Sequence, residues 1–328
     1  MKKIILAAMA LAALAACTKE TTVDVAREEI AFGNAFIDNS TKADAATDPS
    51  YSTTGNGVAL TQFNVYGAVN GVNIFDGNTV AKGEAAYGSA WSLTGAKQYW
   101  IAGADYKFVG VVDGTKSGVT TITPDAAGLP ATIQYTADGE TDLLCDVVTV
   151  DDAAAPYGVV AFNYTHLLSK INFAVKNTTD ASATNYRFVL TSAKLTNAYE
   201  SAEYDVNTDE WTPAADMREF DLANLTINSG ATQYHSQEVL LIPGSAVGVY
   251  VKANIEATDN GTAWTVVSTV EKTFANALGM VDSTPKTLAR ATAYNFIVEL
   301  GVGTEIQFSA AAMPEWTDGD GDSNTVLR

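Results

Sequence analysis

Short runs of alternating apolar and polar residues, separated by turn-forming residues, occupy most of this chain. Successive side chains of a β-strand point to opposite faces of a sheet, so a period of two is typical of half-buried strands. Thr, Val, Tyr and Ala are abundant, whereas the 25 Gly fall mostly between the apolar runs and Pro occurs only 8 times. Helical periodicity is weak. The pattern predicts an all-β protein with antiparallel strands.

The predicted strands fall into two sets. The first set comprises residues 28–37, 63–69, 72–75, 90–93, 106–112, 132–135, 143–150 and 159–164. The second comprises residues 170–175, 186–195, 202–206, 238–242, 247–257, 264–274, 293–300 and 305–311. Asp259-Asn260-Gly261 separates two of them, which is typical of a hairpin. A chain of 328 residues is also long for one core. We therefore expect two β-sandwich domains, residues 28–164 and 165–328.

Acidic residues outnumber basic residues in this chain. There are 38 Asp and Glu against 19 Lys and Arg, a formal charge of −19. Nucleic-acid binding needs a basic surface, so this charge argues against a nucleic-acid partner. It also argues against electrostatic attachment to anionic lipid.

The first residues carry the features of an export signal. Lys2 and Lys3 precede an apolar run over residues 4–13, which is too short to span a membrane. Leu14-Ala15-Ala16-Cys17 then resembles the bacterial lipobox, with small residues before the cut and a thiol to acylate. We expect residues 1–16 to be a signal peptide, Cys17 to be lipidated and residues 17–27 to form a polar tether. An ordinary secretory signal with a chance Cys is the alternative.

Residues with reactive side chains are few. With Cys17 acylated, Cys145 has no partner for an internal disulfide, and we expect it to be a buried strand residue. His166 and His235 are too far apart for a His-x-x-x-His metal site, and no Gly-x-Ser-x-Gly motif is present. A buried His, hydrogen-bonded to backbone, is expected rather than a catalytic one.

Two further patterns have ordinary interpretations. Asp318-Gly319-Asp320-Gly321-Asp322 resembles the start of a calcium loop, but it lacks the later Gly and Glu, so we expect a solvated acidic tail. The five Trp could form a sugar platform, although core or cross-strand positions are more common in β-sandwiches. The sequence predicts no cofactor, no metal site and no enzymatic activity.

Several motifs, in their order and spacing, resemble the fimbrillin (Mfa-like) family of Bacteroidales. These motifs are Asp142-Leu143-Leu144, residues 160–173 (VAFNYTHLLSKINF), Leu240-Leu241-Ile242-Pro243, Tyr294-Asn295-Phe296 and Pro314-Glu315-Trp316. The resemblance, with the lipobox, extends over nearly the whole chain.

The resemblance implies two tandem transthyretin-like antiparallel β-sandwich domains in a pilus subunit of the outer membrane, acting in surface adhesion. Family members are exported as lipoproteins, and a protease then removes the first β-strand. A strand of another subunit fills the groove that this opens. The implied partners are therefore other pilus subunits, either further copies or related fimbrillins, and outer-membrane lipid through Cys17.

The family pattern can be placed on residues of this chain. The removable strand would lie within residues 28–42, with Ile30, Phe32 and Phe36 as plugs. Cleavage would follow Lys42, although the family usually carries Arg there. Cleavage after Arg27 is the alternative, and it would shed the lipid but keep the strand.

The C-terminal part of the chain contains candidates for the strand that enters another subunit. The segment around Ile306 and Phe308, which face the same way, is a possible donor, and the tail after Trp316 is another. Stalk, tip and anchor roles stay open, as does a host-surface or glycan ligand. A monomeric glycan-binding lipoprotein of the cell surface is the alternative function, and a secreted hydrolase is a second one.

Overall fold

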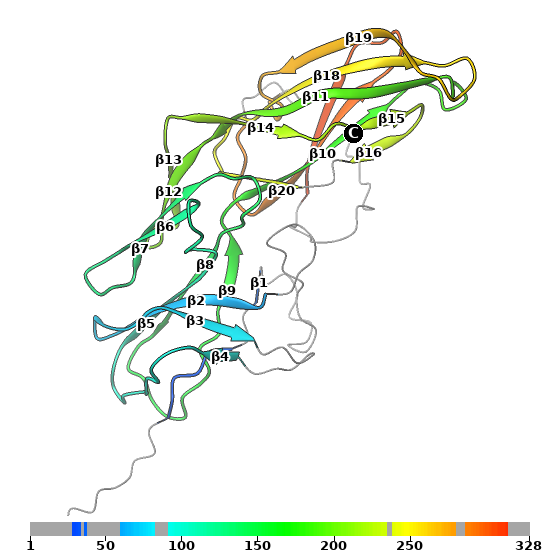
Figure 1. Ribbon diagram of the computed structural model, residues 1–328. Helices are drawn as coiled ribbons and strands as arrows, with labels where there is room; N and C mark the ends of the chain where they lie inside the picture. The colour runs from blue at the N-terminus through cyan, green and yellow to red at the C-terminus, as the bar shows by residue number, and fades with distance from the viewer. Residues whose placement is uncertain are drawn as a thin grey trace, which may run out of the picture.

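Figure 1 shows the computed structural model, which describes residues 28–33, 36–37, 60–82, 91–234, 238–279 and 286–313. Every regular element within these ranges is a β-strand, so the prediction of an all-β fold is confirmed. The described part of the chain contains no helix that is long and apolar enough to cross a membrane. The transthyretin-like type of the domains stays a prediction.

A seven-stranded sheet forms the lower end of the molecule in Figure 1, with the order β1-β9-β8-β5-β2-β3-β4. Its neighbours are antiparallel, except that β1 runs parallel to β9. The strands are β1 (Phe36–Ile37), β2 (Gln62–Val69), β3 (Val72–Lys82), β4 (Trp91–Leu93), β5 (Tyr106–Val112), β8 (Leu144–Val150) and β9 (Asn163–His166).

Both faces of this sheet are buried. On β5, Phe108 contributes to one apolar cluster and the adjacent Val109 to another. We call the first cluster the N-terminal core; its buried members are Ile30, Phe32, Leu60, Phe63, Val65, Phe75, Val80, Trp100, Ala104, Tyr106, Phe108, Val112, Leu144, Ala153, Val160, Phe162 and Tyr164. The second, the main core, continues from Val109 through β7, β10, β11, β12, β18 and β20.

A four-stranded sheet lies next to the seven-stranded one, with the order β13-β12-β7-β6. Its strands are β6 (Thr120–Pro124), β7 (Pro130–Thr136), β12 (Ser201–Asp205) and β13 (Glu210–Pro213). The antiparallel pairing of β7 with β12 joins strands from the two sides of residue 165. The proposed division of domains near that residue stays a prediction.

Two five-stranded sheets form the upper end in Figure 1 and share the main core. One has the path β16-β10-β20-β21, with β17 also paired to β10; the other has the path β14-β11-β18-β19, with β15 also paired to β11. Their strands are β10 (Ser169–Asn177), β11 (Tyr186–Tyr199), β14 (Met217–Leu222), β15 (Thr226–Asn228), β16 (Thr232–Tyr234), β17 (Val239–Leu241), β18 (Gly248–Ala257), β19 (Thr265–Phe274), β20 (Thr292–Leu300) and β21 (Gln307–Met313).

The structure differs from the predicted strands at short elements. The sequence did not predict β6, β13, β14, β15 or β16. They lack a long apolar alternation, and their pairing with other strands forms these ladders, with β7 for β6, β12 for β13, β11 for β14 and β15, and β10 for β16. The strand predicted over residues 159–164 begins only at Asn163. The strand predicted over residues 28–37 contains single bridges at Glu29 and Phe32, and regular pairing starts at β1.

Candidate functional site

The segment of residues 28–33 is hydrogen-bonded along both of its edges. On one edge, the Ile30 amide donates to the Gln98 carbonyl (2.9 Å), and the Trp100 amide donates to the Glu28 carbonyl (3.0 Å). This is antiparallel pairing with the loop before β5. The segment is the darkest blue trace in Figure 1, at the lower end of the molecule.

The other edge of the segment pairs with the loop before β9. The Val160 amide donates to the Ala31 carbonyl (2.8 Å), and the Gly33 amide donates to the Val160 carbonyl (3.1 Å). The pairing is parallel, and β1 continues it beside β9. The segment therefore fills a slot between two parts of the chain, as an inner strand of a sheet does.

Two side chains of the segment point into the N-terminal core. Ile30 is 1% exposed and Phe32 is 6% exposed. The ring centroid of Phe32 lies 5.4 Å from that of Phe75, 5.8 Å from Phe108 and 6.3 Å from Phe162. Full burial of one such side chain contributes about 1.5–3 kcal/mol. The even spacing predicted that both side chains point inward, and both are buried; their role as plugs of a removable strand stays a prediction.

The alternate residues of the segment face solvent. The Glu29 carboxylate lies 2.6 Å from Lys97 Nζ, and Ala31 is exposed. Hydrogen bonding with Glu29 raises the pKa of Lys97. Exposed ion pairs stabilise little, so this pair contributes little to the free energy that keeps the segment in place.

The other predicted assembly residues lie partly or wholly outside the described residues. For Phe36 the structure describes the backbone in β1 but not the side chain. Cys17, Arg27 and Lys42 are all outside the described ranges. Lipidation, cleavage and the third plug therefore stay predictions.

The possible donor residues lie at and just before β21. Within the described residues, β21 pairs with one strand only, β20, so it is an edge strand of its sheet. Phe308 is half-buried, with its ring centroid 5.3 Å from Phe274 and 5.4 Å from Phe296. Ile306 is also half-buried. An edge strand can leave its sheet by breaking one ladder only.

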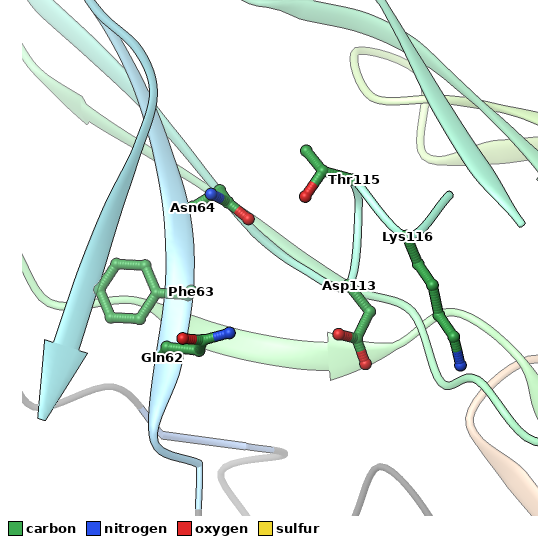
Figure 2. A pocket seen from close by; sticks show the side chains of 6 residues that line it. All are labelled: Gln62, Phe63, Asn64, Asp113, Thr115 and Lys116. Carbon is green, nitrogen blue, oxygen red and sulfur yellow. The ribbon is translucent and has the colours of Figure 1, made fainter. Parts of the chain in front are cut away.

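A polar hollow of about 180 Å³ lies beside β2. Figure 2 shows the side chains that line it, from Gln62, Phe63, Asn64, Asp113, Thr115 and Lys116. Burial raises the pKa of Asp113, with further contributions from Asp142 and Asp138 against the lowering effect of Lys116. The ring of Phe63 points away from the Asp113 side chain in Figure 2, so it presents no stacking face to a sugar here.

His166 is buried, as predicted, but its Nδ1 pairs with a carboxylate where a backbone partner was expected. Its Nδ1 lies 2.5 Å from Asp142 Oδ2, and the two side chains are 2% and 1% exposed. The residues lie where β8 begins and β9 ends. Since both groups are enclosed, the pair joins two strands and offers no surface to a substrate. His235 is outside the described residues.

Cys145 is buried with a free thiol, in agreement with the prediction from its strand. Burial raises its pKa well above the ordinary range, so the group is a protonated thiol and a poor nucleophile. In the described ranges, no group of three or more His, Cys, Asp or Glu side chains could hold a metal ion. Residues 318–322 lie outside those ranges.

Two of the Trp side chains, Trp100 and Trp211, occupy structural positions. Trp100 is buried and stacks on Tyr157 at 5.4 Å between centroids. Trp211 is the cross-strand neighbour of Tyr204, and its indole donates to a backbone carbonyl at 2.8 Å. The prediction of core and cross-strand positions is therefore confirmed for Trp100 and Trp211. Trp316 is outside the described residues.

Comparison with solved structures shows the same fold at low sequence identity. A candidate cell adhesion protein from Bacteroides uniformis ATCC 8492 has a TM-score of 0.54 and 13% identity, over 83% of this chain and 95% of that one. A fimbrial protein from Bacteroides vulgatus ATCC 8482 has a TM-score of 0.55 and 13% identity, over 78% and 93%. No curated protein matches the chain in sequence.

The family comparison covers most of the chain. The Fimbrillin-like family matches residues 39–316. This agrees with the motifs on which the fimbrillin resemblance was based. The chain belongs to the Fimbrillin-like family.

Proposed function

We propose that the chain is the lipoprotein precursor of a fimbrial subunit for surface adhesion. It is exported to the outer membrane, loses its first strand to a protease and assembles by donor-strand exchange, without catalysis. The observation that carries this proposal is the slot around residues 28–33, with hydrogen bonds on both edges and two plugs in the N-terminal core.

Loss of the segment would leave the slot in an unfavourable state. The backbone groups of Gln98, Trp100 and Val160 that now bond to it would lose their partners. The rings around Phe32 would lose an enclosed neighbour. Buried backbone groups without partners and exposed apolar surface are both costly. A strand from another subunit restores both, which is β-augmentation.

The cleavage that frees the slot is assigned to Lys42. A cut there would separate residues 28–42 from the rest of the chain, so that only non-covalent contacts hold them. Lys in place of the Arg of the family pattern favours a protease that accepts Lys. A cut after Arg27 would release the protein from Cys17 and its lipid while the slot stays filled.

The donor is assigned to the region of Ile306 and Phe308. Its edge position and half-buried side chains make it easier to detach than a central strand. The terminal tail after Trp316 is the alternative donor. A tip subunit would need only the slot, and an anchor would need the donor while keeping its lipid.

The proposal is tested on protein extracted from the cell surface. Intact mass and N-terminal sequencing, before and after limited trypsin, report the start of the chain, and SDS gels report assembly. We expect a start at Ala43 together with a ladder of SDS-resistant oligomers. Lys42→Gln should abolish both, whereas the matched Arg27→Gln should leave both intact.

Retention of the acylated N-terminus would contradict the proposal. A stable start at acylated Cys17, with no ladder after trypsin, contradicts strand exchange by this chain as a stalk subunit. It would favour an anchor or a monomeric glycan-binding lipoprotein.

A further inference from the structure

A short sequence occurs twice in this chain, at positions far apart. Residues 29–33 read Glu-Ile-Ala-Phe-Gly, and residues 305–309 read Glu-Ile-Gln-Phe-Ser. Both have the form Glu-Ile-x-Phe followed by a small residue. The first copy lies in the slot of the N-terminal core, and the second lies at the start of β21.

The two Glu residues have equivalent partners in the fold. Glu29 pairs with Lys97 at 2.6 Å, and Glu305 pairs with Lys272 at 2.7 Å. Both ion pairs lie at the solvent face. If Glu305 replaced Glu29 beside Lys97, the charge and the length of the side chain would therefore stay the same.

The two Phe residues also have equivalent surroundings, but they differ in burial. Phe32 is 6% exposed among three Phe rings. Phe308 is half-buried against Phe274 and Phe296. The Ile residues also differ in burial: Ile30 is 1% exposed, whereas Ile306 is half-buried.

The first copy of the sequence also has more extensive backbone hydrogen bonding than the second. The segment of residues 28–33 is bonded on both edges, whereas β21 is bonded to β20 alone among the described residues, from Gln307 onward. A chain with the second sequence would therefore gain a second bonded edge and fuller burial in the slot. The second bonded edge and the fuller burial favour this segment in the slot, while the loss of its ladder with β20 opposes its departure.

We propose that residues 305–309 of a second copy of this chain occupy the slot in one fixed register, residue for residue in place of residues 29–33. Ile306 takes the site of Ile30, Phe308 takes that of Phe32, and Glu305 pairs with Lys97. This proposal rests on the proposed function, and it adds the identity of the partner and the register. The subunit is then self-complementary and forms a polymer of one chain.

The register is tested by disulfide trapping between two copies. Glu29 lies directly opposite Tyr99, so position 305 of a second copy should take that place. Chains that carry Cys17→Ser, with Tyr99→Cys in one and Glu305→Cys in the other, are mixed after limited trypsin and oxidised. The matched control replaces Glu305→Cys by Gln307→Cys, which is on the same exposed face but about 7 Å further along the strand. An uncleaved chain with Glu29→Cys and Tyr99→Cys verifies that the site permits a disulfide.

We expect the 99–305 dimer to form at least about tenfold faster than the 99–307 dimer, because cross-strand Cβ atoms lie about 5 Å apart only in the proposed register. A ladder with equal or preferred 99–307 trapping would overturn the register and leave strand exchange intact.

Peptide binding shows whether a negative result means that a second copy is not the partner or that the slot does not bind a strand. If the cleaved chain stays monomeric and binds a peptide of residues 28–37 but not one of residues 303–313, the slot exists and a second copy is not its partner. If it binds neither peptide, the proposed function fails as well.

Discussion

The N-terminal core and the main core are closed in different ways. The main core lies between sheets with long ladders, such as the nine-residue parallel pairing of β10 with β20. The N-terminal core is smaller, and residues 28–33, a short segment near the start of the chain, complete it. Loss of one terminal segment can therefore open the N-terminal core while the ladders of the main core remain. Closure of the N-terminal core thus depends on one short segment, whereas long ladders close the main core.

Aromatic rings give the opening in the N-terminal core a definite shape. Phe75, Phe108 and Phe162 surround the side chain of Phe32 with their own rings. Rigid rings cannot collapse far into an empty site, so the loss of a neighbour leaves a cavity. The space among these three rings therefore fits a large, flat side chain such as that of Phe32.

The largest effect is expected from Phe32→Ala. The cavity among three rings should lower the free energy of unfolding by about 3–5 kcal/mol, measured by urea denaturation. Phe308→Ala is the matched change in the main core, and its half-buried ring should cost only about 1–2 kcal/mol. Equal losses would mean that the two Phe sites do not differ as their burial indicates.

A smaller effect is expected when a side chain is added behind the same core. A Cβ on Gly110 would clash with Tyr164 Oη and lie 2.9 Å from Phe162 Cδ1. Gly110→Ala should therefore cost about 1–3 kcal/mol in thermal unfolding. Gly158→Ala is the control, since a Cβ there meets nothing within 4 Å, and it should change stability by less than about 1 kcal/mol. A neutral Gly110→Ala would show that the N-terminal core is loosely packed.

The smallest effect concerns an ion pair at the edge of the main core. Asp209, in the turn between β12 and β13, pairs with Arg290 and accepts a hydrogen bond from Tyr204 at 2.5 Å. Burial would raise the pKa of Asp209, but the bonds from Arg290 and Tyr204 outweigh it and lower the pKa. Asp209→Asn should cost less than about 1 kcal/mol at pH 7, because the carboxylate is half exposed.

The pH dependence of that loss has a definite sign. A lowered pKa in the folded state adds stability that is present above the unfolded pKa, about 3.9, and is lost as pH falls through the folded value. Urea midpoints of the parent and Asp209→Asn should therefore converge below about pH 4. A difference that grows on acidification would contradict the role of the carboxylate.

Long apolar runs could be located from the sequence, whereas short strands could not. The predicted bounds of Tyr106–Val112 are those of β5, because the run is apolar on both faces apart from Lys107. β13, β15 and β16 are three or four residues long, and the partners of β15 and β16 are distant in the chain. Local pattern carries little information about such pairing.

At the candidate site, too, the sequence could predict inward residues but not the residues that they contact. Even spacing identified Ile30 and Phe32 as inward residues. It could not identify Phe75, Phe108 and Phe162 as the walls of their slot, because the fold brings these residues together from separate strands. The double hydrogen bonding of the segment is likewise visible only in three dimensions.

The bonds on both edges of residues 28–33 also decide how a strand in that place responds to force. Backbone bonds between strands lie across the strand direction. A pull along the strand therefore loads both edges in shear, and the bonds on both edges must break together before Phe32 can move past its neighbours. A pull across an edge strand such as β21 would instead open one ladder a bond at a time. A strand in the slot can bear tension along its length that the same strand at the sheet edge would not withstand when peeled.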